Sequence, residues 1–190
     1  IKVAGCDNQQ KRGGLPLTIV GVGGGFSYSD AGPTHYTTES ISTMRSIPGL
    51  EVLSPSDNRA VAEATKLTFE KPGFRYIRLD RQCLPQIYEE GRTDFVENGL
   101  AEVIEGEDIC LIATGYTTHK AVELVKNLEK EGIKLGVVDV FKIEPFNSEL
   151  LAEIINKYYK VVSWEEHFIK GGLGSIVAET LTDFGMGQSL

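Results

Sequence analysis

The feature that most constrains the fold is an alternation of short apolar runs with amphipathic stretches of helical spacing. In the first series the predicted strands are 17–20, 51–53 and 74–79, and the predicted helices are 38–46 and 58–70. In the second series the predicted strands are 109–113, 135–140 and 160–164, and the predicted helices start near 117, 148 and 173. Strands that alternate with helices form parallel sheets with helices on both faces. We therefore predict an α/β fold of two three-layer modules with mainly parallel sheets.

The two series are separated by a stretch, residues 81–100, that contains Pro85, Gly91 and Gly99 and shows no clear periodicity. Twenty irregular residues are unusual inside one compact domain, so this stretch predicts a linker. The expected organisation is a first domain over 1–82, a linker over 83–100 and a second domain over 101–190. Each series has only three predicted strands, so we expect both domains to be cut short at an outer end.

Charge and cysteine content narrow the class of protein. The 19 basic and 27 acidic residues give a net charge of −8, which argues against binding to nucleic acid. No apolar run approaches the roughly 20 residues of a membrane span, and no signal segment is recognisable. Cys6, Cys83 and Cys110 are far apart, so neither a disulfide framework nor a cysteine zinc site is expected. A cytoplasmic location is the expectation.

A glycine-rich turn at 21–25 follows the first predicted strand and matches no nucleotide-binding pattern. Phe26 and Tyr28 stand where a dinucleotide fingerprint needs glycine, and no GK[ST] follows. The next residues include Ser27, Tyr28, Asp30 and His35, at the carboxyl end of a parallel strand where α/β sheets bind ligands. The alternative is a tight surface turn in which the histidine only caps the chain.

Two arginines, Arg78 and Arg81, flank Asp80 at the end of another predicted strand of the same module. The planar guanidinium suits a phosphate or a carboxylate, because it donates hydrogen bonds in pairs. An ion pair between Asp80 and an arginine at the domain edge is the alternative. Together with the loop that bears His35, the arginines favour a phosphorylated, hydroxyl-rich substrate.

Glu165, Glu166 and His167 follow the last predicted strand, where they could serve acid–base chemistry or bind a metal. Neighbouring residues of a strand point to opposite faces, so the three side chains cannot converge on one ion. We therefore predict no metal site and favour a structural or interface role for all three. His119 lies in the first turn of a predicted helix and is expected to be exposed or to cap it.

Several motifs in this order resemble one family. They are GGGFSYSDAGPTH at 23–35, IPGL at 47–50, SPSD at 54–57, RQCLP at 81–85, IATG at 112–115, WEEH at 164–167 and GGLGS at 171–175. The chain resembles the transketolase family of thiamine diphosphate enzymes, and within it the separately encoded C-terminal subunit. The motifs of the second module are also similar to those of deoxyxylulose-phosphate synthases and of 2-oxo acid dehydrogenase beta subunits.

The resemblance implies a partial pyrimidine-binding domain followed by the transketolase C-terminal domain. It assigns His35 a catalytic role beside the thiazolium, where it would hydrogen-bond the oxygens of the donor. It assigns Arg81 to the phosphate of the sugar, and Ser27, Tyr28 and Asp30 to the substrate. Transketolases commonly carry Asp directly before GPTH, whereas Ala31 stands there in this chain and Asp30 lies one place earlier.

The resemblance also implies that thiamine diphosphate and Mg²⁺ are held mostly outside this chain. The family's glutamate and aromatic residue for the cofactor would lie upstream of Ile1, and an N-terminal subunit or domain would hold the diphosphate. The expected function is transfer of a two-carbon ketol unit between sugar phosphates, in a homodimer or heterotetramer, with the isolated chain inactive. The alternatives are deoxyxylulose-phosphate synthesis, 2-oxo acid decarboxylation, or a non-catalytic module for dimerisation and partner binding.

Overall fold

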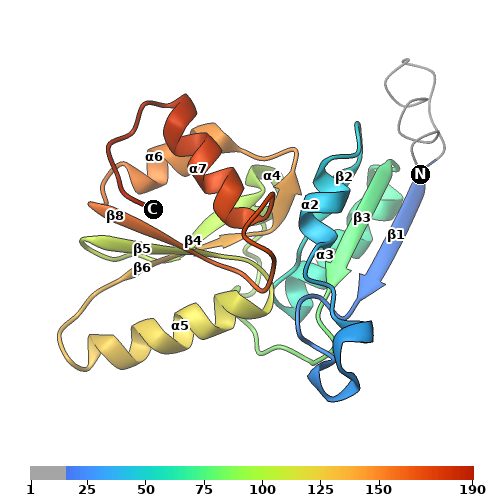
Figure 1. Cartoon of the computed structure of the whole chain (residues 1–190), viewed down its shortest axis with the longest axis horizontal. Coiled ribbons are helices and arrows are strands. Elements are labelled where there is room, and N and C mark those ends of the chain that lie inside the picture. The colour runs from blue at the N-terminus through green and yellow to red at the C-terminus, as the bar shows by residue number, and fades with distance from the viewer. Residues whose placement is uncertain (1–15) are drawn as a thin grey trace.

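The computed structural model describes residues 16–190, which form two four-stranded sheets covered by helices (Figure 1). In the first sheet the strands lie in the order β1, β3, β2, β7. Their bounds are β1 (Leu17–Val22), β2 (Glu51–Leu53), β3 (Phe74–Leu79) and β7 (Lys142–Glu144). Strands β1, β3 and β2 are parallel, and β7 pairs with β2 in the antiparallel direction.

The second sheet has the strand order β4, β6, β5, β8. Its strands are β4 (Leu100–Ile104), β5 (Ile109–Ala113), β6 (Gly136–Val140) and β8 (Lys160–Trp164). Strands β6, β5 and β8 are parallel, and β4 is antiparallel to β6 at the sheet edge. Both sheets are thus mixed and mainly parallel, which confirms the predicted α/β class with two modules.

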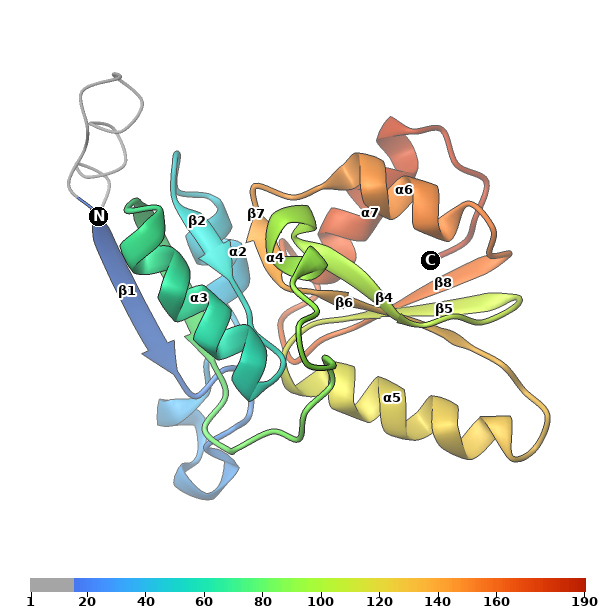
Figure 2. The same cartoon turned by 180° about the vertical axis from the view of Figure 1, so that it is seen from behind.

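Helices cover both faces of each sheet. They are α2 (Ser40–Arg45), α3 (Asn58–Glu70), α4 (Asp94–Asn98), α5 (Tyr116–Glu129), α6 (Ser148–Ile155) and α7 (Leu173–Asp183). Helices α2 and α3 lie on opposite faces of the first sheet (Figures 1 and 2). Helix α5 covers one face of the second sheet, and α6 and α7 cover the other. Within residues 16–190, every helix falls short of the length and hydropathy needed to cross a bilayer.

The bounds of α3 follow directly from its sequence. Asp57 precedes the helix in an extended conformation, and its side chain accepts a hydrogen bond from the Ala60 amide, as an N-cap does. Ala60, Ala64 and Leu67 recur at helical spacing and are the buried residues of the helix. Pro72 lies two residues beyond Glu70 and stops further helix formation.

The prediction that residues 81–100 are irregular is wrong for 94–98, which form α4. Phe95 of this helix is fully buried, and its ring stacks on that of Tyr88 with 3.9 Å between centroids. The amides of Ile87 and Tyr88 both donate to Asp57 Oδ2, at 2.8 and 3.0 Å. A five-residue helix is too short to show a periodic pattern, and this one is held by aromatic packing. The domain boundaries 1–82, 83–100 and 101–190 stay a prediction.

Strands β4 and β7 were not predicted, and β7 links the two modules. It follows the second sheet's β6 in the chain but pairs with β2 of the first sheet, with Val52 opposite Glu144 and Leu53 opposite Lys142. Its central residue, Ile143, is fully buried. Three residues carry too little periodicity to predict a strand, so only the partner strand defines it.

One hydrophobic core extends through both modules. Its members include the fully buried Ile41 and Val52 from the first module and Val138 and Leu173 from the second. Burial of apolar surface contributes about 25 cal/mol per Å², so this shared core favours a fixed arrangement of the modules. The modules therefore share part of the interior that stabilises them.

A buried carboxylate, that of Asp139 on β6, reinforces this junction. It accepts hydrogen bonds from the hydroxyls of Ser56 at 2.6 Å, Tyr88 at 2.5 Å and Thr118 at 2.6 Å. Asp139 is fully buried, and the loss of water raises the pKa of its carboxyl group. Ser56 precedes α3, Tyr88 lies in the connecting segment and Thr118 belongs to α5, so one carboxylate joins four parts of the chain.

Replacing this carboxylate tests its structural contribution. We expect Asp139→Ala to lower the free energy of unfolding by about 3 kcal/mol, because three buried hydroxyls lose their acceptor. Asp139→Asn keeps one acceptor oxygen and should cost less. Urea unfolding monitored by circular dichroism measures both changes. The exposed Asp183 provides the control, with a change of about 0.5 kcal/mol or less on replacement by alanine. Equal effects of the two alanine variants would contradict this role of Asp139.

Candidate functional site

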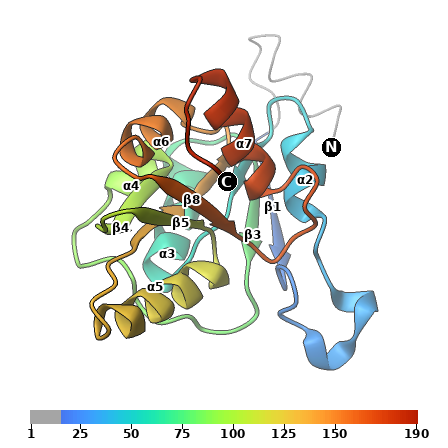
Figure 3. The same ribbon diagram turned by 60° about the vertical axis from the view of Figure 1, so that its left-hand side comes forward.

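The candidate site is a loop at the carboxyl ends of β1 and β3. The amides of Gly23 and Gly24 donate to the carbonyl of Leu79 at 2.8 and 3.0 Å, which joins the loop to the end of β3. Gly25 and Thr37 form an isolated antiparallel bridge that brings the two ends of the loop together. The residues between them carry two short 3-10 helices, η1 (Ser29–Ala31) and η2 (Pro33–His35). Figure 3 shows this loop beyond the ends of β1 and β3.

Two glycines of the turn are needed for steric reasons. Gly23 has φ +96° and Gly25 has φ +61°. At such positive φ values a residue with a Cβ atom is strained, and glycine is not. A Cβ atom on Gly23 would lie 2.3 Å from the ring of Tyr28, and one on Gly25 would lie 2.3 Å from Glu166 Oε2. The glycine cluster therefore lets the loop backbone pack closely against both side chains.

Four of the predicted site residues lie together on this loop and beside it. Arg81 donates from its Nη1 atom to Asp30 Oδ1 at 2.6 Å, and its guanidinium lies 4.8 Å from the centre of the Tyr28 ring. The ring of His35 is 5.9 Å from that of Tyr28. Hydrogen bonding to Arg81 lowers the pKa of the Asp30 carboxyl group, which favours the charged pair. The cluster is open to solvent, and 45% of the Arg81 side chain is exposed.

Ser27, the fifth predicted residue, faces a different partner. Its hydroxyl lies 2.7 Å from the carbonyl of Gly24 and 3.1 Å from Asp80 Oδ1. The other oxygen of Asp80 accepts from the amide of Tyr116, the first residue of α5, at 2.9 Å. Asp80 forms no ion pair within residues 16–190, so the predicted alternative of an Asp80–arginine pair is wrong, and Arg81 pairs with Asp30 instead. Asp80 thereby connects the loop to the second module.

A cavity of about 210 Å³ opens beside Arg81. Gln82 and Cys83 line it next to Arg81, and Asp57 and Asn58 line it at the start of α3. The guanidinium has five donor N–H groups, and its pair with Asp30 leaves others available for an anion. Such N–H groups are of the kind that bind the oxygens of a phosphate or a carboxylate.

Glu165 and Glu166 point in different directions and serve different contacts. The two oxygens of Glu165 accept from the amides of Leu173 and Gly174 at 2.7 and 2.8 Å, which caps the start of α7. Glu166 Oε2 accepts from the amide of Phe26 at 2.9 Å. One carboxylate thus stabilises a helix of its own module and the other contacts the candidate site loop.

His167 connects the last loop to α2. Its Nε2 accepts from the amide of Ser42 at 3.2 Å, and its Nδ1 donates to the carbonyl of Phe168 at 2.7 Å. Both ring nitrogens are occupied by main-chain groups, so the side chain has an interface role. Within residues 16–190, no group of three or more His, Cys, Asp or Glu side chains is arranged to hold a metal ion.

His119 was expected to be exposed or to cap α5, and the structure corrects this expectation. Its ring is partly buried, and Nε2 hydrogen-bonds to the carbonyl of Ser56 in the first module. The sequence could not indicate this contact, because the two residues are 63 positions apart.

The fold is that of an α/β protein, and the loop lies at the carboxyl ends of parallel strands, where such folds generally bind their ligands. Residues 7–86 match the transketolase pyrimidine-binding domain, and residues 99–188 match the transketolase C-terminal domain. The chain therefore belongs to the transketolase family.

Similar proteins include transketolases and a related synthase. One subunit of the apulose-4-phosphate transketolase of Phocaeicola vulgatus is 33% identical over 88% of this chain and 54% of its own length. The 1-deoxy-D-xylulose-5-phosphate synthase of Aquifex aeolicus is 31% identical over 87% of this chain and 26% of its own length. A split-gene transketolase solved as an inactive beta4 tetramer has a TM-score of 0.77 and 33% identity, with 95% of this chain and 60% of that chain covered. The chain thus spans about half the length of the Phocaeicola vulgatus protein that it matches.

The capping role of Glu165 gives a stability prediction. Gly172 at the N-cap has no side chain, so Glu165 satisfies the first amides of α7 in its place. We expect Glu165→Ala to lower the free energy of unfolding by about 1–2 kcal/mol, as loss of a cap does. Urea unfolding monitored by Trp164 fluorescence measures the change. Replacement of the exposed Glu153 on α6 is the control, and a loss no larger than in this control would refute the cap.

Proposed function

We propose that this chain is the C-terminal part of a split transketolase-type enzyme, which transfers a two-carbon ketol unit between sugar phosphates. The observation that carries the proposal is the grouping of Arg81, Tyr28 and His35 beyond the ends of β1 and β3, with a cavity that Arg81 lines. The similarity to one subunit of an apulose-4-phosphate transketolase over most of the chain supports it.

Each side chain of the cluster has a role in this proposal. Arg81 binds the phosphate of the sugar, and its contacts with Asp30 and Tyr28 hold the guanidinium in place before the ligand arrives. His35 donates or accepts hydrogen bonds at the oxygens of the ketose donor. Asp30 and Tyr28 complete the substrate-binding surface. Ser27 contributes through the loop, since its hydroxyl faces Gly24 and Asp80.

The transketolase family depends on thiamine diphosphate, and the described residues do not fit the cofactor's diphosphate and Mg²⁺. No acidic or histidine cluster with the arrangement of a metal site is found in residues 16–190. An N-terminal subunit or domain therefore provides the residues that hold the diphosphate and Mg²⁺. The two parts together form a homodimer or heterotetramer in the cytoplasm.

An alternative within the family is the reaction of a deoxyxylulose-phosphate synthase, which the similarity to the Aquifex aeolicus enzyme supports. Both reactions use phosphorylated substrates, so the role of Arg81 is common to them. A 2-oxo acid carries a carboxylate that an arginine can also bind, so Arg81 alone does not separate it from a sugar phosphate. The segment RQCLP at 81–85, which resembles that of transketolases, favours the sugar phosphate. A non-catalytic module needs no such cluster of polar side chains.

Replacement of Arg81 tests this assignment in the enzyme reconstituted with its N-terminal subunit. We expect Arg81→Ala to raise KM for phosphorylated substrates by about tenfold to a hundredfold, because a hydrogen-bonded charge pair is lost. KM for unphosphorylated analogues should change little. Steady-state kinetics with both substrate classes measure the difference.

Arg92 provides a matched control, since it is also a partly exposed arginine paired with an aspartate, Asp94, away from the cavity. Arg92→Ala should leave both KM values unchanged. An equal rise of KM for phosphorylated and unphosphorylated substrates in Arg81→Ala would remove the phosphate role.

A further inference from the structure

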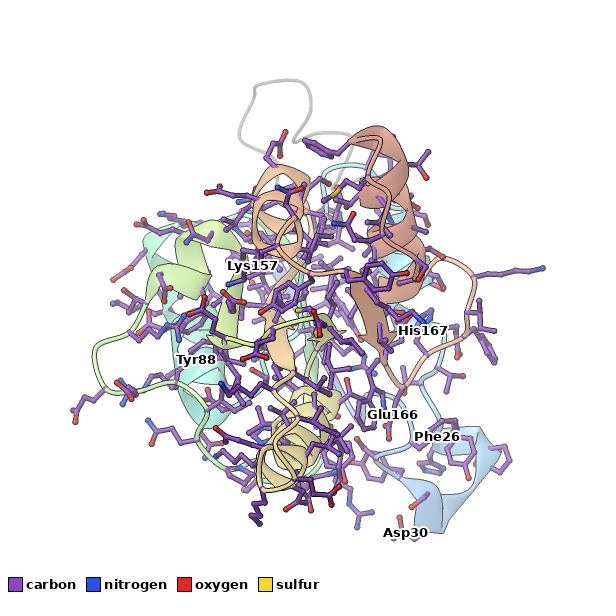
Figure 4. All side chains as sticks on the ribbon, turned by 90° about the vertical axis from the view of Figure 1, so that its left-hand side faces the viewer. Phe26, Asp30, Tyr88, Lys157, Glu166 and His167 are labelled. Carbon is purple, nitrogen blue, oxygen red and sulfur yellow. The ribbon has the colours of Figure 1, made fainter. Side chains whose placement is uncertain are left out.

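Glu166 holds the candidate site loop from the other module. Among the described residues it is the one side chain of the second module that hydrogen-bonds to the loop between Gly23 and Thr37. Its Oε2 accepts from the Phe26 amide at 2.9 Å. Figure 4 shows Glu166 beside Phe26, with Asp30 farther out on the same loop.

The loop and the glutamate are packed without spare room. A Cβ atom on Gly25 would lie 2.4 Å from the Cβ of Glu166, so only glycine allows the Phe26 amide to come this close. The main chain of Glu166 is held in turn, since Arg78 Nη2 donates to its carbonyl at 3.4 Å. Arg78 is buried at the end of β3, beneath the glycine turn. The main chain that carries Glu166 is therefore tied to the end of β3.

The contact acts where it can orient the whole loop. Phe26 is the first residue after the bridge between Gly25 and Thr37, and its ring packs edge-on against Tyr36 at the other end, with 5.0 Å between centroids. Tyr28 and His35 lie between these two aromatic residues in the chain. A fixed Phe26 therefore limits the positions that both can adopt.

We propose that Glu166 is a positioning residue through which the second module fixes the loop bearing Tyr28 and His35, and thereby sets substrate affinity. Glu166 itself touches no substrate. The proposal rests on the proposed function, because it takes the loop to bind the sugar phosphate. In this proposal the second module contributes to the site of the first module by holding its loop in position.

Amide hydrogen exchange of the full-length protein tests the positioning without reference to activity. In Glu166→Ala the loop peptide over 24–30 should exchange about tenfold faster, because a charge-assisted hydrogen bond is lost. Glu166→Gln keeps an acceptor oxygen and should restore most of the protection. Glu179→Ala is the matched control, since Glu179 joins the second module to Arg45 at 2.6 Å without contacting the loop. Unchanged exchange of this peptide in Glu166→Ala would overturn the proposal.

Kinetics of the reconstituted enzyme test the consequence for substrate. Glu166→Ala should raise KM for the phosphorylated donor by about tenfold, because Asp30 and Tyr28, the partners of Arg81, lie on the released loop. A merely structural loss would reduce the amount of folded enzyme and lower kcat with KM unchanged. Glu166→Gln should recover most of the affinity, and Glu179→Ala should match the parent enzyme.

The outcome separates this inference from the proposed function. A raised KM in Arg81→Ala with an unchanged KM in Glu166→Ala would overturn the role of Glu166 alone. An unchanged KM in both variants would overturn the proposed function and, with it, this inference.

Discussion

The buried carboxylate of Asp139 fixes how the two modules meet. A carboxylate without water needs hydrogen-bond donors, and the three that it has, Ser56, Tyr88 and Thr118, come from the first module, the connecting segment and α5. Thr118 is the donor to Oδ1, while Ser56 and Tyr88 share Oδ2, so replacement of Asp139 would leave all three hydroxyls without this acceptor. The shared apolar core and the pairing of β7 with β2 also hold the modules together, because each is built from residues of both modules.

The candidate site depends on this arrangement, because contacts from the second module hold it. Asp80 accepts a hydrogen bond from the first amide of α5, and Glu166 accepts one from the Phe26 amide of the candidate site loop. The side chains proposed to bind substrate all belong to the first module, but the position of their loop is set across the junction. No residue of the motif at 164–167 lines the cavity beside Arg81, so its contact with the site is through the loop.

Most of the helices and strands could be predicted from the sequence, because the spacing of apolar residues within each segment indicates which residues are buried. Helix Asn58–Glu70 and strand Ile109–Ala113 have the predicted bounds, since apolar spacing and capping residues define both. Strands β4 and β7 and helix α4 were not predicted, because these short segments have no clear apolar pattern of their own and distant partners stabilise them. Stability here came from tertiary contacts rather than from local sequence preference.

The same limit applies to the site. The loop and the arginine segment could be assigned to one rim because the carboxyl ends of parallel strands lie at one edge. The pairing of Arg81 with Asp30, instead of with Asp80, depends on where the loop folds back. The contact between Glu166 and Phe26 joins residues 140 positions apart, and no sequence spacing indicates it.

The central claim is that this chain provides the substrate loop and another subunit provides the cofactor's diphosphate and metal site. Titration calorimetry with thiamine diphosphate and Mg²⁺ tests it most directly, first on the protein that carries this chain and then on its mixture with the N-terminal subunit. We predict binding in the mixture and none by this protein alone. Binding by this protein alone, or no binding in the mixture, would contradict the claim.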